Sequence, residues 1–404
     1  MNANVGYLER GSKEYRRGNL ALFAAGLATF AILYSVQPLF PVFSNEFALS
    51  PAAVSLSLSI STIMLAISLP VASFLSDRVG RKSFMGLSLL LSSLCCLCVA
   101  FAPDFTSLMI IRAIQGVLLA GIPAVAMAYL SEETEAKSLR LALGLYISGN
   151  TVGGLFGRIA VSSITDLYSW RWGIISIALV SLLASLYFWR NLPPSRHFKP
   201  RRTGPKSIMQ LFVAQFRDST LVLLFLLAAI LMGSFVTLYN YLGFRLIEAP
   251  FNLSQTLVGG IFILYLVGTF SSSWMGYMSN RIGLGMALWI NIALMLLGGM
   301  ITLSNHLAAV ILGVAVFTFG FFGSHSTASS WVGIRASAGK AQASSLYLLF
   351  YYGGSSVGGS VGGLFWSRYG WGGIVGMISC LILFGAVAVL LLTVVLPKRA
   401  PVRS

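Results

Sequence analysis

Charged residues are scarce in this chain, making up only 9% of its 404 residues. Soluble domains carry roughly 25% charged residues, so this composition excludes an ordinary soluble core. Apolar residues account for 57% of the chain and fall in repeated runs of about 20 residues, enough for a helix to cross a bilayer. The ~10-residue alternating segments of a membrane β-barrel are missing. We therefore predict an all-α polytopic membrane protein.

Catalytic and metal-binding patterns are also missing. The four cysteines have neither the spacing of a zinc site nor that of a redox pair. No phosphate-binding loop is present, so an ATP-driven pump would need a separate subunit. The apolar runs contain no H-E-x-x-H motif, no paired acids and no orienting acid beside a serine and histidine. We expect no enzyme activity, no metal and no cofactor apart from a proton gradient.

The net charge of +16 would suggest a nucleic-acid partner if read alone. Most basic residues, however, fall in alternate loops and at both termini. The exceptions are Arg112, Arg158, Arg171, Arg245 and Arg368. This asymmetry follows the positive-inside rule and predicts that both termini are cytoplasmic. The charge therefore indicates topology, and we expect no nucleic-acid partner.

The hydrophobic runs predict twelve transmembrane helices. Their ranges are 20–43, 52–75, 84–102, 107–130, 141–163, 170–190, 220–243, 255–278, 284–304, 308–330, 342–365 and 371–396. The one long polar stretch in the interior, 192–218, is basic and predicts a cytoplasmic linker. It separates an N-terminal six-helix bundle at 1–191 from a second bundle with a short cytoplasmic tail at 219–404.

The two halves repeat one another about 200 residues apart. F-A-L-S at 47–50 matches F-N-L-S at 251–254, and the loop at 73–82 has a degenerate copy at 276–283. Glycines spaced by four residues occur in the fifth and eleventh predicted helices and permit close helix packing. They are Gly149, Gly153 and Gly157 in the first half and Gly354, Gly358 and Gly362 in the second. Parallel repeats of this kind are typical of two-domain transporters.

The loop at 73–82, S-F-L-S-D-R-V-G-R-K, resembles the signature of the Major Facilitator Superfamily, G-x-L-a-D-r-x-G-r-K, with Ser73 in place of glycine. R-A-I-Q-G at 112–116 matches the superfamily's R-x-x-q-G motif. G-N-T-V-G-G at 149–154 is similar to its antiporter motif G-P-x-x-G-G, with Asn150 in place of proline. The resemblance covers essentially the whole chain and is greatest to the drug:proton antiporter and sugar-efflux branch.

The resemblance implies two six-helix bundles related by a pseudo-two-fold axis and a loop that closes the cytoplasmic side. The gating residues would be Asp77, Arg78, Gly80, Arg81 and Lys82. Independently, a carboxylate at a helix end can accept N–H bonds from a facing helix N-terminus. The bases could pair with acids in the next cytoplasmic loop, such as Glu132, Glu133 and Glu135. The alternative is that the positive charges only fix the topology.

Arg112 lies within a predicted helix, where a bare charge costs at least ~2.5–3.5 kcal/mol near the bilayer centre. It should face a water-filled cavity or a partner, with Gln115 on a neighbouring face. It could then bind substrate or couple to a proton site. The alternative is a structural arginine that snorkels towards the loop. Arg158 is placed near the outer end of its helix, where we expect it to snorkel.

His325 is the one side chain placed inside a helix whose ordinary pKa lies near neutrality. No acidic residue falls in a predicted helix interior, so proton coupling would use His325, Asp77 or a carboxylate at the rim. The alternative is a hydrogen-bonded histidine in the core.

Polar and aromatic residues occur at equivalent depths of the first and seventh predicted helices. They are Tyr34 and Gln37 in the first and Tyr239 and Asn240 in the seventh. Rings with a few hydrogen-bonding groups suit an amphiphilic ligand. The alternative is that the tyrosines belong to the interfacial aromatic belt.

The expected function is secondary active transport by alternating access. The resemblance favours proton-coupled efflux of a small organic solute or drug across the inner membrane. A facilitator or uptake permease for a small metabolite such as a sugar is the first alternative, and a membrane receptor or scaffold is the second. The expected partners are a small-molecule substrate and the lipid bilayer, and we expect a monomer.

Overall fold

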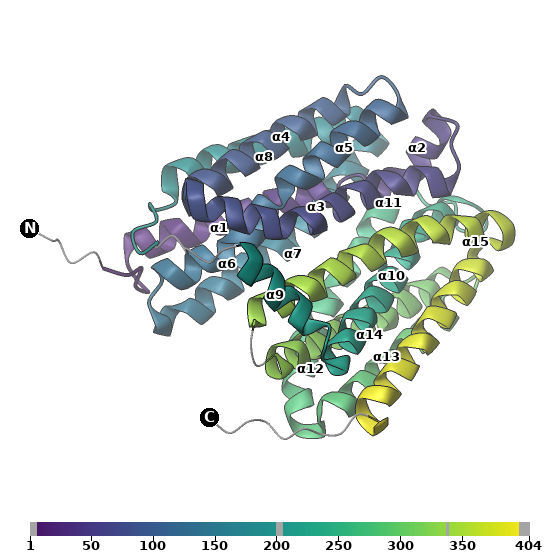
Figure 1. The fold of residues 1–404 in the computed structure, drawn as a ribbon. Coiled ribbons are helices and arrows are strands. Elements are labelled where there is room, and N and C mark those ends of the chain that lie inside the picture. The colour runs from purple at the N-terminus through teal and green to yellow at the C-terminus, as the bar shows by residue number, and fades with distance from the viewer. Residues whose placement is uncertain (1–5, 199–204, 337–338, 396–404) are drawn as a thin grey trace, which may run out of the picture. The chain divides into compact units, whose positions relative to one another are not determined.

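The computed structural model describes residues 6–198, 205–336 and 339–395. Within these ranges the chain is helical, with one isolated bridge between Leu8 and Thr134 (Figure 1). The linker residues Lys199, Arg201 and Arg202 and the tail from residue 396 lie outside the described residues.

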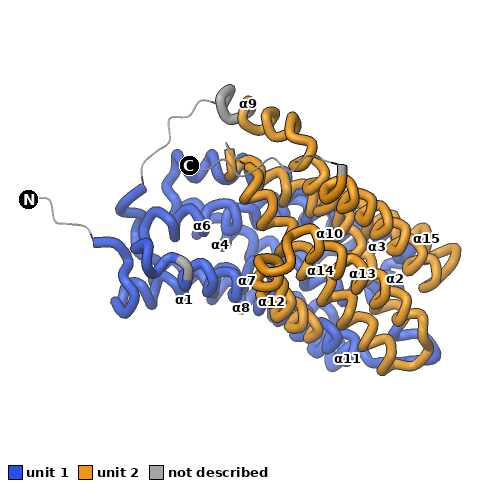
Figure 2. The backbone as a smooth tube through the Cα atoms, turned by 90° about the horizontal axis from the view of Figure 1, so that it is seen from below, with its two compact units in different colours: residues 1–202, 246–262 blue, residues 203–245, 263–404 orange. Residues whose placement is uncertain are grey.

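The chain forms two compact units (Figure 2). Unit 1 contains residues 1–202 and 246–262, and unit 2 contains residues 203–245 and 263–404. The helices of unit 1 are α1 (Lys13–Tyr34), η1 (Gln37–Leu39), α2 (Phe40–Glu46), α3 (Pro51–Val79), α4 (Arg81–Ala100), α5 (Phe105–Leu119), α6 (Gly121–Glu133), α7 (Ala136–Leu167), α8 (Trp170–Asn191) and α11 (Gln255–Gly260). Those of unit 2 are α9 (Pro205–Gln215), α10 (Ser219–Ile247, up to Arg245), α12 (Tyr265–Ile282), α13 (Leu284–Ile301), α14 (Leu307–Arg335) and α15 (Lys340–Leu390).

Ten helical stretches in the described residues are long and apolar enough to cross a membrane. The last of them, 342–394, contains two spans, because α15 bends at Gly370, where the backbone is not helical (φ 56°, ψ −144°). The 32-residue helix α7 supplies a further span; it is less apolar because it carries several glycines, Asn150 and Arg158. The predicted twelve-helix all-α membrane fold is confirmed.

The repeated sequence motifs adopt repeated backbone conformations. Ser50 caps the N-terminus of α3, and Ser254 caps that of α11 in the same way. Gly80 alone joins α3 to α4, and Gly283 alone joins α12 to α13. Their φ angles are 96° and 86°, values that side chains with a Cβ disfavour and glycine permits. The loop motif is therefore built on a one-residue turn in both units.

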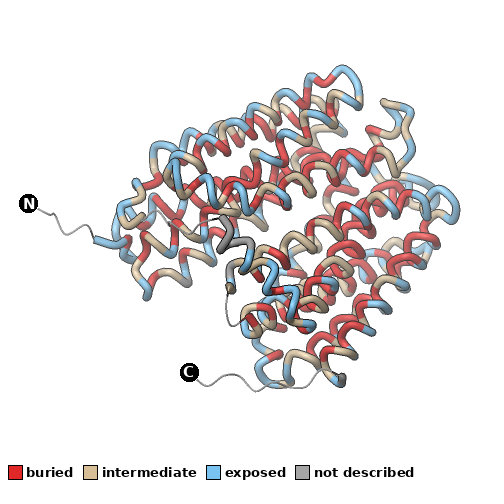
Figure 3. Tube along the Cα trace, in the orientation of Figure 1, coloured by how far each residue is buried: buried red, intermediate tan, exposed pale blue. Residues whose placement is uncertain are grey.

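Buried residues line the helix faces that meet other helices within each unit, while large apolar side chains remain exposed on the outer faces (Figure 3). The most buried spans are those of α1 and α10, each with 72% of its apolar window buried. The first and the seventh helices of the chain are thus the central helices of their units. A polar side chain on α1 or α10 is therefore surrounded by protein and not by lipid.

The spaced glycines allow a neighbouring helix to approach at backbone distance, as the sequence predicts. In unit 1, a Cβ on Gly157 would lie 2.7 Å from the Ala31 backbone of α1. In unit 2, a Cβ on Gly358 would lie 2.7 Å from the Gly233 carbonyl of α10, and one on Gly354 would overlap the backbone of Ala229. The central helices are held in place by these contacts.

We expect Gly354→Ala to lower the melting temperature of the detergent-solubilised protein, with a loss of about 1–3 kcal/mol from overpacking. Gly353→Ala is the matched control, because a Cβ at Gly353 meets no atom within 4 Å and alanine favours helix by up to about 1 kcal/mol. Equal melting temperatures for the two variants would contradict the close packing of α15 on α10.

Candidate functional site

The loop between α3 and α4 is held together by the guanidinium of Arg81, which is 4% exposed. Arg81 Nη1 lies 2.7 Å from Asp77 Oδ1. Its Nη2 and Nε donate to the two carboxylate oxygens of Glu132 at 2.8 and 3.1 Å. A bidentate ion pair of this kind fixes the relative orientation of the two side chains and also neutralises their charges. The expected pairing of this loop with an acid of the next one is confirmed for Arg81 and Glu132, and it ties α4 to α6.

The other two bases of the loop have different partners. Lys82 Nζ donates to the Leu192 carbonyl at 2.6 Å, and the Arg78 guanidinium lies over the Phe74 ring at 4.7 Å. Of the three bases that could pair with Glu132, Glu133 or Glu135, Arg81 is the one for which the described residues show such a pair. The gating role of Asp77, Arg78, Gly80, Arg81 and Lys82 stays a prediction.

Glu133 is buried and binds the beginning of the linker instead. Its carboxylate accepts a hydrogen bond from the His197 backbone N–H at 2.8 Å and lies 3.1 Å from His197 Nδ1. The Tyr7 ring stacks on the His197 ring at 4.1 Å between centroids. Leu8 donates its N–H to the Glu133 carbonyl. The segment before α1 and the first linker residues are thereby fastened to the same end of unit 1, which the sequence analysis did not predict.

The first helix of unit 1 is interrupted inside the membrane-spanning stretch 13–46. Its regular part ends at Tyr34, and Pro38 and Pro41 follow in the next two elements. A proline cannot donate a backbone hydrogen bond, and the last carbonyls of any helix have no partner within it. In a membrane these carbonyls need another donor, because water is absent.

Arg112 of α5 supplies that donor. Its side chain is 1% exposed, and Nη2 and Nη1 donate to the carbonyls of Leu33 and Ile32 at 2.8 and 3.2 Å. Nε donates to the Ser57 carbonyl of α3 at 3.0 Å, and Nη1 also donates to Gln115 Oε1 at 2.5 Å. The Arg112 charge is therefore compensated by protein partners. The sequence leaves open both this environment and a water-filled cavity.

Gln115 extends the Arg112 network. Its Nε2 donates to the Ser92 carbonyl of α4 at 3.1 Å, and the side chain is fully buried. One arginine and one glutamine thus join α1, α3, α4 and α5. Whether either side chain also contacts substrate stays a prediction.

The expectation that Arg158 snorkels to the interface is wrong. The side chain is 1% exposed, because α11 packs on α7 and its neighbour Phe262 covers the guanidinium at 4.7 Å. Arg158 Nε donates to Gln37 Oε1 at 2.8 Å and Nη1 donates to the Gly154 carbonyl at 2.7 Å. The guanidinium also lies 4.1 Å from the centre of the Tyr34 ring. Two predicted site residues, Tyr34 and Gln37, therefore meet at a buried cation.

No acidic residue balances these cations from the middle of a helix. All 11 Asp and Glu residues fall among the described residues, and each lies in the terminal turn of a helix or in a connecting segment. The charged side chains in the middle of the helices are therefore basic, and a protonated histidine would add further positive charge.

Unit 2 contains a continuous group of rings around Tyr239 and His325, which we call the aromatic cluster. Its members are Phe235, Tyr239, Tyr265, Phe321, Phe322, His325, Tyr347 and Tyr351. Phe235 and Phe321 stack at 3.9 Å between centroids, and the Tyr239 hydroxyl lies 2.8 Å from Thr318 Oγ1. The tyrosine of α10 is thus in the protein interior, where an interfacial belt would not place it.

His325 is half-buried at one end of the aromatic cluster. Its Nδ1 lies 3.0 Å from the Tyr347 hydroxyl of α15, and the Tyr351 ring lies 4.7 Å away between centroids. Since most members of the cluster come from α14 and α15, far from α10 in sequence, composition alone could not identify it.

Known proteins place the chain in a transporter family. A family model described as Major Facilitator Superfamily matches residues 21–358. The chain belongs to the Major Facilitator Superfamily. It is 50% identical over 377 residues to the MFS-type transporter YybF of Bacillus subtilis, covering 93% of each chain. It is 46% identical over 376 residues to the inner membrane transport protein YnfM of Escherichia coli, covering 93% of this chain and 90% of that one.

The superfamily fold is also found by comparison of structures. The crystal structure of a bacterial homologue of the human lysosomal transporter Spinster matches with a TM-score of 0.75 at 18% identity, covering 95% of this chain and 97% of that one. The predicted resemblance to the superfamily is confirmed, and the chain is a multi-pass membrane protein of a transporter family.

Two asparagines singled out by the sequence lie on the central packing faces of this superfamily member. Asn150 stands where the antiporter motif has proline, and α7 continues unbroken from Ala136 to Leu167. Its side-chain oxygen points at Gly26 of α1, where a Cβ would collide with it. Asn240 is 1% exposed on α10. A role of either residue in binding stays a prediction.

We expect Arg112→Lys to lower the free energy of unfolding by about 1–3 kcal/mol. The single ammonium group of a lysine cannot bind all the carbonyls that the Arg112 guanidinium binds, so some of them would be left unpaired. Thermal melting in detergent measures the change. Arg171→Lys is the control, since the Arg171–Glu46 pair at 2.6 Å is exposed and such pairs contribute about 0–1 kcal/mol. A wild-type melting temperature for Arg112→Lys would show that the carbonyls of α1 do not depend on this arginine.

Proposed function

We propose that the protein is a secondary active transporter of the bacterial inner membrane that exports a small organic solute in exchange for protons. It works by alternating access, without a cofactor other than the proton gradient and without enzyme activity. The observation that carries the proposal is the pairing of His325 with Tyr347 inside the aromatic cluster of unit 2. It places a titratable group next to surfaces suited to an organic ligand.

The proton is assigned to His325 because the chain offers no acid at mid-helix depth. Histidine changes its charge near neutral pH, and ionisable residues within membrane helices typically mark proton or substrate paths. The Tyr347 hydroxyl at 3.0 Å from Nδ1 can donate to the neutral ring or accept from the charged one. The imidazole can therefore gain and release a proton without losing its hydrogen bond.

The solute is amphiphilic, because each unit offers aromatic surface with few hydrogen-bonding groups. Unit 2 presents the aromatic cluster, and unit 1 presents the Tyr34 ring beside Gln37 and Arg158. The residues proposed for binding or coupling are Tyr34, Gln37, Arg112, Gln115, Asn150, Tyr239, Asn240 and His325.

The direction and topology rest on sequence features. The similarity of residues 149–154 to the antiporter motif supports export. The basic loops and termini support a cytoplasmic location of both ends by the positive-inside rule. The proposed transporter functions as a monomer.

Transport can be tested after a ligand screen, because a ligand that binds the folded protein raises its melting temperature. Flux of a stabilising solute is then measured in proteoliposomes with and without a pH gradient. We expect flux that a pH gradient accelerates. Flux that does not depend on the pH gradient would indicate a facilitator or uptake permease. If no stabilising solute is transported, the protein is a receptor or scaffold.

We expect Asp77→Asn to slow turnover severalfold while leaving solute affinity nearly unchanged, because it removes the ion pair with Arg81 and not a solute contact. The measurements are the initial flux rate and the binding constant. Asp104→Asn is the control, since Asp104 caps α5 at an exposed position. A wild-type flux rate for Asp77→Asn would remove this residue from the gate.

We expect His325→Ala to flatten the pH dependence of transport, because the variant lacks the side chain that carries the proton. The flux is measured across a series of pH values with equal pH on both sides. His306→Ala serves as the control, because His306 is exposed before the start of α14. If His325→Ala keeps the wild-type pH profile, the histidine belongs to the packing of unit 2 only.

A further inference from the structure

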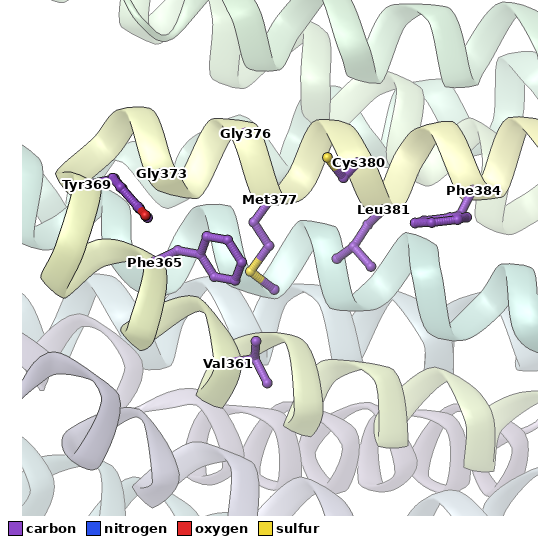
Figure 4. A pocket seen from close by; sticks show the side chains of 9 residues that line it. All are labelled: Val361, Phe365, Tyr369, Gly373, Gly376, Met377, Cys380, Leu381 and Phe384. Atoms are coloured by element: carbon purple, nitrogen blue, oxygen red, sulfur yellow. The ribbon is translucent and has the colours of Figure 1, made fainter.

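An apolar groove of about 480 Å³ runs between the two arms of α15 (Figure 4). Val361 and Phe365 of the first arm line one side, and Met377, Cys380 and Phe384 of the second arm line the other. The lining is open at Gly376, which is exposed and where an added Cβ would meet no atom within 4 Å. None of these residues belongs to the proposed transport site.

The groove opens on the hydrocarbon layer. Both arms lie within the membrane-spanning stretch 342–394, and Phe384 is 67% exposed. An apolar hollow of about 480 Å³ on such a surface matches the chemistry of a lipid acyl chain. Lipid tails are as apolar as the lining, so contact with them gains no hydrophobic free energy. Specific retention of a lipid would need close packing together with a contact to its head group.

A basic residue adjoins a lining residue of the groove in the sequence. Tyr369 lines the groove next to the bend at Gly370, and Arg368 precedes it in the chain and is exposed. No carboxylate among the described residues pairs with Arg368. An arginine donates strong charge-assisted hydrogen bonds to phosphate, and the bend is where the chain reaches the end of the membrane span. The charge thus complements a phospholipid head group.

We propose that this groove is a phospholipid site, in which one acyl chain lies between the arms of α15 and the phosphate is bound by Arg368. The site is independent of transport. A bound chain would fill the hollow that Gly376 leaves between the two arms and would hold their outer surfaces together.

The test uses Cys380 as a reporter. In a variant with the other three cysteines replaced by alanine, Cys380 carries a bimane label, and the detergent-solubilised protein is titrated with phosphatidylglycerol that has brominated acyl chains. Bromine quenches bimane on contact. We expect quenching that saturates near one lipid per chain. A label placed instead at Cys98, exposed on α4 of unit 1, should be quenched without saturation.

Two substitutions locate the lipid. Gly376→Leu fills the groove and should abolish the saturable quenching, whereas Gly372→Leu, one turn away with equally open space, should retain it. Arg368→Gln should weaken the apparent affinity by roughly 10- to 150-fold, because a hydrogen bond to a charged group contributes about 1.5–3 kcal/mol and every 1.4 kcal/mol is about a factor of ten. Brominated diacylglycerol, which lacks the phosphate, should bind as weakly. Native mass spectrometry of the unlabelled protein counts the same bound lipid without the probe, and melting curves confirm that each variant is folded.

The proposal is overturned if labels at Cys380 and Cys98 are quenched alike without saturation, or if folded Gly376→Leu keeps the lipid. Disulfide-linked dimers through Cys380 of the unlabelled protein, together with quenching that does not saturate in the labelled protein, would identify a second copy of the chain as the occupant. Equal binding by Arg368→Gln would overturn the assignment of the phosphate.

Discussion

A helix that breaks inside a membrane leaves backbone carbonyls that water cannot reach, and unit 1 is arranged around this constraint. The first helix stops at Tyr34, and the prolines after it prevent its hydrogen-bonding pattern from continuing. Arg112 donates to the buried carbonyls of Ile32 and Leu33 and also to the Ser57 carbonyl of α3. The break sets the direction of the next residues, and this brings Gln37 to Arg158.

Apart from Arg81, which pairs with acids, the buried arginines of both units are compensated by carbonyls, side-chain amides and rings. In unit 2, Arg245 donates to the carbonyls of Thr302 and Ser304 just after α13 and lies over the Trp371 ring at 5.0 Å. Carbonyl dipoles and aromatic faces stabilise a cation without fixing a second full charge in the bilayer. These buried cations are therefore stabilised without mid-helix carboxylates, which is why the proposed proton site is His325.

Sequence reasoning recovered the elements that depend on local pattern. Apolar run length predicted the twelve helices, and the repeated loop motif has the same one-residue glycine turn in both units. The charges of the loop at 73–82 predicted the pairing of Arg81 with Glu132. Each of these depends on spacing along the chain or on opposite charges at the same membrane boundary.

Features that depend on tertiary contact could not be predicted in the same way. The sequence places Arg158 near the end of its predicted helix, and the packing of α11, about 100 residues later, buries it. Glu133 and His197 meet because the chain after α8 returns to the end of α6. The aromatic cluster is assembled from four helices in a chain with 12% aromatic residues, where composition does not distinguish one ring from another.

The coupling of solute movement to proton movement is the central claim, and one measurement tests it most directly. Proteoliposomes containing a trapped pH dye are given a gradient of a solute identified by thermal stabilisation, with equal pH on both sides at the start. We predict that solute movement drives protons the opposite way and changes the internal pH, and that His325→Ala abolishes this change. Solute movement at wild-type rate with constant internal pH would contradict it.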